Sequence, residues 1–580
     1  MLIDINASFG GREALQRFTV ESLEHELNRT PYSLAFVSAN EGEFDPRTAN
    51  DDILERCARH DRWLPTATLH PGDTFSWQDE LRRAQAIGIK LFRINPVASG
   101  WAADSILMDL LVDRLAGTGA ALIVGSAPAG LPSRIAGKTA LAGVPVIFTE
   151  ARYFPLTELI PLAQHYQDIY IETSRLTSPG GIALCVGEIG AHRLLYGSGA
   201  PRYPAGVAWR MLQWAEISDA QRTAIAWRNA STLLGLDPPP LFRPPSGVKS
   251  ASGQVTIISA VKAESDPESN DAERGTISVA RRGTPHETQL RQKLQQTERK
   301  TMTGLRALGP SEPANSGPAF PPAVDVHLHD KFAGAPFPRF SPADYDAELA
   351  RNRILAGVSS SATAIFHDLR KGNDQQEAVL REVPRLRGYV VVDPRYLDDS
   401  LVELDRLSDS DRWVGVKVHC AHARTLTGSP AMANLMAAVA ERERPILVHP
   451  LGADWPEALS VLARRHPKLP IVAAHGGYGD APHPTHDAVL RLAGFPNVVV
   501  EFCSTYLAPG AIRRGIRSLG VERVLFGSDF PLISLEYMRV AYNDAELTGE
   551  EEEAIFIKNA LRLFPSLGAL VEEGCPTNQA

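Results

Sequence analysis

The sequence has few cysteines and no long apolar run. Only five cysteines occur among 580 residues, and none belongs to a CxxC pair. Disulfides and thiolate metal sites are therefore not expected, so any metal would need histidine and carboxylate ligands. No apolar run approaches the ~20 residues of a membrane span, and no basic leader with an apolar segment precedes the first strand-like stretch. We expect a soluble, cytoplasmic protein without a membrane partner.

The charge pattern also lacks a long basic block. The formal net charge is -9, which is mildly acidic for a chain of this length. A nucleic-acid partner is therefore not expected, and a small-molecule substrate is the better expectation. The length exceeds what one ordinary core needs, so the chain should contain at least two domains.

Two series of strand-like segments run along the chain. The C-terminal series reads AVDVHLH, SSATAIF, GYVVVDP, VGVKVH, PILVHP, IVAAHGG, NVVVEF and RVLFGSDFP. The N-terminal series reads LIDINAS, SLAFVSA, LPTATLHP, GIKLFRI, ALIVGS, PVIFTEA, DIYIET and RLLYGSGAP. Helix-length amphipathic segments separate most of them, which predicts an α/β protein with two tandem (β/α)₈ TIM-like barrels. We expect the barrels at 1–236 and 323–580.

The connector, residues 237–322, is rich in proline, serine, glycine and mixed charge. Such a composition buries too little apolar surface to offset the entropy of ordering, so we expect a mostly flexible, disordered linker. The two series can be superposed with an offset that rises slowly from 321 to 330 residues, as loop insertions in a duplicated domain would produce. The matched pairs are Asp4 with Asp325, Lys90 with Lys417, Glu172 with Glu501, Gly199 with Asp529, and Asn229 with Asn559.

Metal-binding residue types lie at the strand ends of the second series. In strand order they are His327 and His329, Lys417 and His419, His449, His475, and Asp529. Functional groups of a (β/α)₈ barrel cluster at the C-terminal ends of its strands, so these side chains should meet. Imidazole nitrogen with carboxylate oxygen suits Zn²⁺ and similar divalent metals, and a catalytic site leaves one position open for water. His419 could contact a second metal or the substrate, or it could equally be an ordinary hydrogen-bonded residue.

Six motifs carry a resemblance to a known family. They are DVHLH (325–329), GVKVH (415–419), ILVHPLG (446–452), AAHGG (473–477), FGSDFP (526–531) and KNALRLF (558–564). In these motifs the sequence resembles the amidohydrolase superfamily, in the branch that includes aminocarboxymuconate-semialdehyde decarboxylase. The resemblance implies that His327, His329, His449 and Asp529 hold a divalent metal, usually zinc, and that His475 polarises the substrate or bound water.

The resemblance leaves two reactions open. The leading expectation is a hydrolase, in which metal-activated water attacks a C–N or C–O bond, Asp529 moves the proton and His475 stabilises the oxyanion. The alternative is a nonoxidative decarboxylase of the same branch. Lys417 could be carboxylated and bridge a second metal, or it could be structural. The other copy keeps a matching lysine, Lys90, although it lacks the predicted metal ligands. A lysine that is retained without a metal site is more simply structural, so we expect a structural Lys417 and one metal per chain.

The first series lacks the predicted ligands. It has Asn6 and Ser8 for the two strand-one histidines and, further on, Phe92 for His419, Gly125 for His449, Glu150 for His475 and Gly199 for Asp529. We therefore expect a metal-free pseudoenzyme barrel that serves the second barrel as a built-in partner subunit. A third expectation, of another class, is that neither barrel is catalytic and the protein acts as a scaffold.

Overall fold

The computed structural model describes residues 1–13, 16–73, 76–125, 128–236, 320–330, 340–407, 410–477 and 488–574. Nearly all of the expected linker lies outside these residues. Within the chain, Met1–Pro238 and Pro318–Ala580 form one compact unit. We call its two parts the N-terminal half and the C-terminal half.

The C-terminal half contains one parallel sheet of eight strands in sequence order. The strands are β12 (Ala323–His329), β13 (Ile354–Ser360), β14 (Leu386–Val392), β15 (Trp413–His419), β16 (Ile446–His449), β17 (Ile471–Ala473), β18 (Val498–Glu501) and β19 (Val524–Leu525). The segment after β19 returns to β12 through a bridge between Leu328 and Phe530. Val326 N also donates to Phe526 O at 3.0 Å. The expected α/β barrel is thus present here in nearly closed form.

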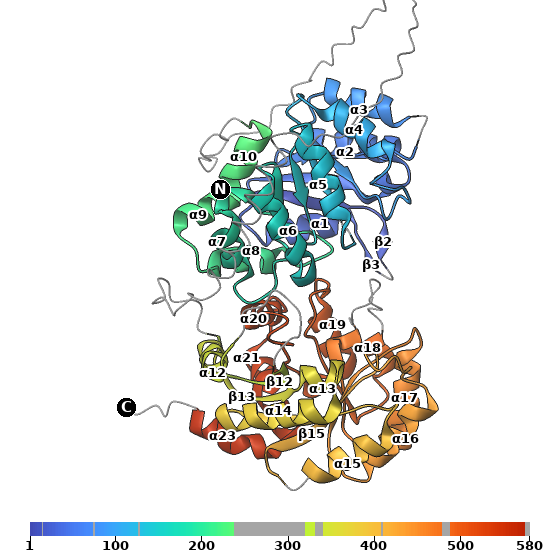
Figure 1. Ribbon diagram of the computed structural model, residues 1–580, viewed down its shortest axis with the longest axis vertical. Coiled ribbons are helices and arrows are strands. Elements are labelled where there is room, and N and C mark those ends of the chain that lie inside the picture. Colours follow the sequence, from blue (N-terminus) through green and yellow to red (C-terminus); the bar gives the residue numbers. More distant parts are fainter. Residues whose placement is uncertain are drawn as a thin grey trace, which may run out of the picture. The chain divides into compact units, whose positions relative to one another are not determined.

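Helices follow the strands of this half. They are α12 (Pro342–Arg351), α13 (Ala362–Phe366), α14 (Leu369–Glu382), α15 (Leu397–Leu407), α16 (Pro430–Ala440), α17 (Trp455–Arg465), α18 (Ala488–Arg491), α19 (Ala511–Leu519), α20 (Leu535–Asn543), α21 (Gly549–Glu553), α22 (Asn559–Leu563) and α23 (Gly568–Gly574). Side chains of Ser341, Ser429 and Ser534 cap α12, α16 and α20. Helices α14 to α17 flank the strands (Figure 1).

The core of this half has two layers. One apolar cluster, which includes Leu404, Met436 and Leu459, fills the space between strands and helices. A second cluster, which includes Leu447, Val472 and Val499, fills the inside of the barrel against α22 and the segment after it. The filled interior leaves only the strand ends available for polar side chains, as the fold requires.

The N-terminal half has the predicted strands in the predicted order, but they pair as two parallel sheets. One sheet holds β1 (Ile3–Phe9), β4 (Leu34–Ala39) and β5 (Trp63–Pro65); the other holds β6 (Ala67–Thr68), β7 (Leu91–Ile94), β8 (Ala121–Val124), β9 (Val146–Phe148), β10 (Ile169–Glu172) and β11 (Leu194–Leu195). The third predicted strand is interrupted at Thr66, after Pro65, which cannot donate to a ladder. Backbone hydrogen bonds still connect the two sheets at both places where they separate. Thr66 N donates to Val37 O at 2.9 Å, and Ile5 N donates to Tyr196 O at 3.1 Å. A complete second barrel stays a prediction.

Helices also alternate with these strands. They are α1 (Val20–Asn28), α2 (Pro46–Arg59), α3 (Trp77–Ala86), α4 (Ile106–Leu115), α5 (Leu131–Leu141), α6 (Tyr153–His165), α7 (Gly181–Ile189), α8 (Ala205–Trp214), α9 (Asp219–Thr223) and α10 (Asn229–Leu234). A short antiparallel pair, β2 (Arg12–Glu13) with β3 (Gln16–Arg17), follows β1.

Both halves share an unusual feature near their ends. A π-helical turn at Ala224–Arg228 precedes Asn229, and another at Ala554–Lys558 precedes Asn559. The Asn229 side chain donates to two carbonyls, at 2.8 and 2.7 Å, and the Asn559 side chain donates to two carbonyls at the equivalent positions, both at 2.8 Å. The same local structure at the same offset supports the predicted duplication.

Among the described residues, no single helix is long and apolar enough to cross a membrane. One bent pair, Gly549–Leu563 with Pro565–Glu573, passes the same test of length and composition together, with a bend of 116°.

Candidate metal centre

Three of the four predicted metal ligands meet at the carboxyl ends of β12 and β19. His329 Nε2 lies 3.0 Å from Asp529 Oδ1, and His327 Nε2 lies 3.8 Å from the same oxygen. All three side chains are buried, and their candidate ligand atoms lie within 4.8 Å of one another. Two imidazoles and one carboxylate at this spacing are a donor set that fits a divalent cation.

The other predicted histidines form a neighbouring row. His475 Nε2 lies 2.9 Å from Nδ1 of His449, the fourth predicted ligand. The His449 ring in turn stacks on His419, with ring centroids 3.7 Å apart. His449 does not belong to the three-residue group just described, so its predicted role as a ligand remains a prediction. His419 contacts this row through His449, and its predicted role at a second metal or at the substrate stays a prediction.

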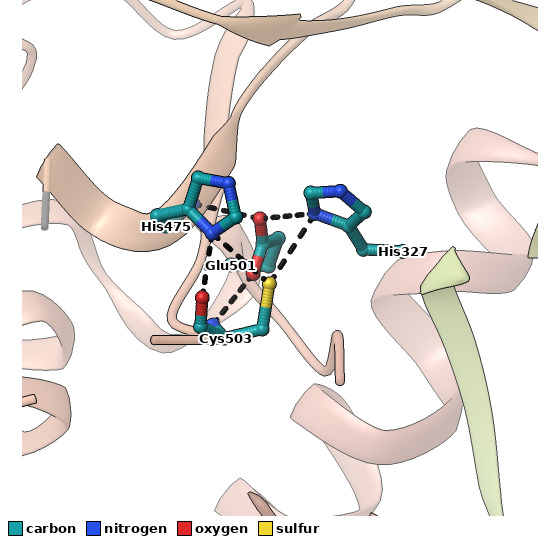
Figure 2. A group of neighbouring side chains, drawn as sticks. All are labelled: His327, His475, Glu501 and Cys503. Carbon is teal, nitrogen blue, oxygen red and sulfur yellow. Dashed lines mark hydrogen bonds and ion pairs between the residues drawn. The ribbon is translucent and has the colours of Figure 1, made fainter. Parts of the chain in front are cut away.

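Two further residues complete the site, and the sequence did not suggest either as a site residue. Glu501, at the end of β18, places Oε1 2.8 Å from His327 Nδ1 and accepts from the backbone N–H of His475 at 2.7 Å (Figure 2). Cys503 Sγ lies 3.3 Å from Nδ1 of both histidines. A carboxylate behind a ligating histidine fixes its tautomer and ring orientation. The only sequence signal was that Glu501 has a counterpart, Glu172.

Cys503 changes the expected ligand chemistry. Together with His327, His475 and Glu501 it forms a second buried group that could hold a metal ion. The expectation of histidine and carboxylate ligands alone therefore has to be widened. Burial and the nearby Glu501 and Asp529 carboxylates raise the pKa of the Cys503 thiol well above its ordinary value, so the free protein holds it as a thiol.

The charges of the site suit a cation. Burial, followed by the charge of Lys417, lowers the pKa of His327 well below its ordinary value, which keeps this imidazole neutral. Burial also lowers the pKa of His449 and His419. For Asp529, burial would raise the pKa, but the hydrogen bond with His329 and the nearby histidines outweigh it and lower the pKa. Neutral imidazoles and an ionised carboxylate are the forms that bind metal.

The backbone is strained where two site residues sit. His475 and Asp529 both have φ of 61°, in the left-handed region that most side chains avoid. Their backbone N–H groups are held, because His475 N donates to the Glu501 carboxylate and Asp529 N donates to His327 O, both at 2.7 Å. The strain aims both side chains at the site.

Lys417 lies inside the site, and its predicted match to Lys90 is wrong. Lys417 Nζ is buried and lies 3.0 Å from His327 Nε2, and burial lowers its pKa to about 8. Lys90 is exposed and precedes β7. Residues that pair across neighbouring strands form one row in each half. In the C-terminal half this row is Lys417, Leu447, Val472 and Val499. In the N-terminal half it is Arg93, Ile123, Ile147 and Tyr170.

Val499 and Tyr170 lie two residues before Glu501 and Glu172, so Arg93 holds the position of Lys417. By the same register Asn95, rather than Phe92, corresponds to His419. Because Lys90 does not match Lys417, it gives no reason to regard Lys417 as structural.

Two segments of the chain, residues 28–236 and 324–566, match the model of a family described as amidohydrolase. Together they make up more than half of the chain. The chain belongs to the amidohydrolase family. The expected family membership is confirmed, and the match in two segments agrees with a tandem arrangement. The family is metal-dependent, in agreement with the buried donor groups of this amidohydrolase.

Solved structures resemble this chain only weakly. A protein assigned as a 2-pyrone-4,6-dicarboxylic acid hydrolase from Pseudomonas putida is 21% identical, with 42% of this chain and 98% of that chain covered and a TM-score of 0.34. The 5-carboxyvanillate decarboxylase of Sphingomonas paucimobilis is 15% identical, with 42% and 99% covered and a TM-score of 0.33. A manganese-bound dihydroxybenzoic acid decarboxylase of Polaromonas is 16% identical, with 42% and 97% covered and a TM-score of 0.31. No curated protein matches the chain.

Proposed function

We propose that the C-terminal half is a metal-dependent enzyme acting on a small carboxylate, with nonoxidative decarboxylation as the first reaction to test. The observation that carries the proposal is the buried meeting of His327, His329 and Asp529 beside Lys417. A divalent ion and the lysine ammonium together still exceed the charge of the two carboxylates of the site, Asp529 and Glu501, by one. A substrate carboxylate would balance that excess, whereas a neutral amide would not. Decarboxylation therefore stands ahead of hydrolysis, which the sequence placed first.

The residues have distinct proposed roles. His327, His329 and Asp529, with His449 as the fourth ligand, would hold the metal, which supplies Lewis-acid polarisation when bound. Lys417 would pair with a negative oxygen of the substrate. Asp529 can accept a proton from a substrate hydroxyl and return it to the carbon that loses CO₂. His475 lies beside His449 and donates from Nδ1 to Cys503 O at 2.6 Å, so its ring would need a second proton, on Nε2, to donate to a developing negative oxygen.

Hydrolysis of a C–N or C–O bond is the second candidate. The same donor set can lower the pKa of a bound water, and Asp529 is ionised and able to accept the water proton. In this reaction His475 would stabilise the oxyanion. Lys417 would then have no substrate charge to pair with unless the substrate also carried a carboxylate.

We propose one ion per chain, with zinc tested first and manganese second. Lys417 Nζ lies 3.0 Å from His327 Nε2, the nitrogen that would ligate the ion, so a bound ion would displace the ammonium from this lone pair and leave it beside a single metal. Elemental analysis of the purified full-length chain should give about one divalent ion. About two ions would instead support a carboxylated Lys417 that bridges a metal pair.

We propose the N-terminal half as a metal-free partner of the catalytic half, with domains at 1–236 and 323–580. Ser534 N donates to Thr177 O at 2.8 Å, and the Arg152 guanidinium lies 4.3 Å from the centroid of the Tyr506 ring. Arg175 also donates to Thr505 O. Thr505 and Tyr506 closely follow Cys503, so these contacts support the segment that leaves the metal centre. A fragment 323–580 with full activity and stability would contradict this role.

Substrate tests should separate the two reactions. Metal-stripped protein, reconstituted with Zn²⁺ or Mn²⁺, would be incubated with 5-carboxyvanillate and dihydroxybenzoates, and CO₂ release would be measured. A parallel panel of lactones and amides would be followed by acid release. Metal-dependent CO₂ release supports the proposal; metal-dependent acid release without CO₂ supports hydrolysis. No turnover in either panel with metal bound would favour the scaffold alternative.

A further inference from the structure

Arg175 reaches from the N-terminal half to the loop that leaves the metal centre. It follows β10, and its side chain is fully buried. Its Nη1 donates to the carbonyl of Thr505, two residues after Cys503. The guanidinium also lies 5.4 Å from the centroid of the Tyr506 ring. A hydrogen bond from a charged donor is stronger than one between neutral groups, so this contact fixes the backbone of the loop firmly.

The loop that Arg175 contacts carries two groups of the metal centre. Cys503 Sγ lies 3.3 Å from Nδ1 of both His327 and His475. The Cys503 carbonyl accepts from His475 Nδ1 at 2.6 Å, which fixes the orientation and tautomer of this ring. A shift of the backbone at Cys503 would therefore move the thiol and release the ring of His475. A contact made two residues further on, at Thr505, restrains both groups.

Arg175 is anchored among the residues that correspond to the metal centre. Glu150 holds the position of His475, because each lies three residues after a member of the same cross-strand row. Both also have left-handed backbones, with φ of 60° and 61°. The Glu150 carboxylate lies 3.4 Å from Arg175 Nε. The Tyr203 ring lies 3.9 Å from the guanidinium, and its Oη donates to Glu150 at 3.2 Å.

The missing aspartate of the N-terminal half makes room for this anchor. Gly199 stands for Asp529, with φ of 66° against 61°. A Cβ at Gly199 would lie 2.8 Å from Cδ2 of Tyr203, which is closer than packed carbon atoms approach. An aspartate there would collide with the ring that covers Arg175. The loss of this ligand and the anchoring of the arginine therefore go together.

The charges of the anchor are matched. Burial would lower the pKa of Arg175, but Tyr203 and the Glu150 carboxylate outweigh it and raise the pKa above its ordinary value. Burial would raise the pKa of Glu150, but Arg175 and neighbouring arginines outweigh it and lower the pKa. Both groups are thus ionised. Separating them would leave a buried charge without its partner, which keeps the guanidinium in place.

We infer that Arg175 is a positioning residue for the metal centre. Glu150 and Tyr203 hold it in the N-terminal half, and through the Thr505 carbonyl it holds residues 503–506 of the other half. The N-terminal half then acts on the site by fixing its geometry and supplies no metal ligand. The inference rests on the metal centre and the partner role proposed above, and it names the residue through which that role is exerted.

Alkylation of Cys503 in the full-length, chelator-treated protein tests the inference. Wild type and Arg175→Met would be treated with iodoacetamide, and the rate at each cysteine would be followed by mass spectrometry of peptides. We expect Cys503 to react about tenfold faster or more in Arg175→Met, because the loop opens more often. Cys420 is buried elsewhere in the same half and should keep its wild-type rate. An unchanged rate at Cys503 would overturn the inference.

A second variant covers a failure of Arg175→Met to fold, which equal increases at Cys503 and Cys420 would reveal. Arg175→Lys keeps the positive charge but loses the planar fork, so it cannot serve Glu150 and Thr505 together. Cys503 should then react about three- to tenfold faster than in wild type, with Cys420 unchanged. A wild-type rate at Cys503 in Arg175→Lys would also overturn the inference.

Arg193→Met provides the matched control. Arg193 is another buried arginine of the N-terminal half, and it donates to the carbonyls of Ile169 at 2.9 Å and Ala163 at 3.3 Å, both in its own half. The variant should lower the midpoint of thermal unfolding, as Arg175→Met does, and leave the rate at Cys503 unchanged. An equal increase at Cys503 would overturn the inference, because any loss of stability in this half would then act on the site.

A spectrum of the metal centre separates positioning from simple support of the loop. In Co²⁺-loaded protein, Arg175→Met should shift the visible absorption bands, whereas Arg193→Met should match wild type. An unchanged spectrum in Arg175→Met would overturn the positioning role. Failure of the proposed metal centre would appear separately, as wild-type protein that takes up no Co²⁺, and the alkylation rates would still decide whether Arg175 holds the loop.

Discussion

Replacing Glu501 by glutamine should weaken metal binding although Glu501 is not one of the proposed ligands. Its carboxylate contacts His327 Nδ1 at 2.8 Å and accepts from the backbone N–H groups of His475 and Cys503, both at 2.7 Å. A glutamine amide offers one oxygen in place of two, so at least one of these three groups loses its acceptor. The ring of His327 then faces either the amide nitrogen, which cannot accept, or a neutral oxygen in place of a carboxylate, and both changes weaken the contact that fixes its orientation and tautomer.

The expected size follows from outer-shell carboxylates in general. Removing such a partner weakens metal affinity about 10- to 100-fold. This range corresponds to roughly 1.4 to 2.7 kcal/mol of binding free energy. Competition with a chromogenic chelator for Zn²⁺ and for Mn²⁺ would measure the change directly, on protein whose folding is checked by circular dichroism.

The duplicated half provides the matched control. Glu172→Gln alters the corresponding network, in which Asn6 replaces His327. It should change stability, as Glu501→Gln does, and leave metal affinity at the wild-type value. The reasoning is refuted if Glu501→Gln binds metal as tightly as wild type, or if Glu172→Gln weakens metal binding to the same degree.

Three further predictions address the site, the pH dependence and the fold. Asp529→Asn should lower turnover by at least 100-fold, because an amide cannot accept a proton, and retained activity in a steady-state assay would contradict its role. Burial raises the pKa of Glu26 from 4.5 to about 7, so the native state binds the extra proton and stability falls as pH rises through that window. Glu26→Gln should remove this cost of up to about 3 kcal/mol at pH 8 and have little effect near pH 4.5, as measured by urea unfolding; equal effects at both pH values would count against it. Asn559→Ala loses two hydrogen bonds to carbonyls and should reduce the free energy of unfolding by roughly 1 to 3 kcal/mol in the same assay, whereas a loss below about 0.5 kcal/mol would show that water replaces the amide.

The alternation of strands and helices was readable from the sequence because it depends on local apolar patterning. The same is true of the gathering of His327, His329 and Asp529, since a parallel barrel brings the carboxyl ends of its strands to one rim. Spacing also predicted that Glu501 and Asn559 have counterparts. Local pattern and chain connectivity were sufficient for these features.

Tertiary structure decided the features that depend on strand register and on close packing. The match of Lys417 with Lys90 assumed a smooth offset, but hydrogen bonds between neighbouring strands set register, and they place Arg93 there instead. The sheet of the N-terminal half divides at Thr66, where the regular ladder stops although Thr66 N still donates to Val37 O, and only the observed strand pairing shows this. The Glu501 and Cys503 contacts with His327 join β18 to β12, far apart in the chain, and only the curvature of the barrel brings them within bonding distance.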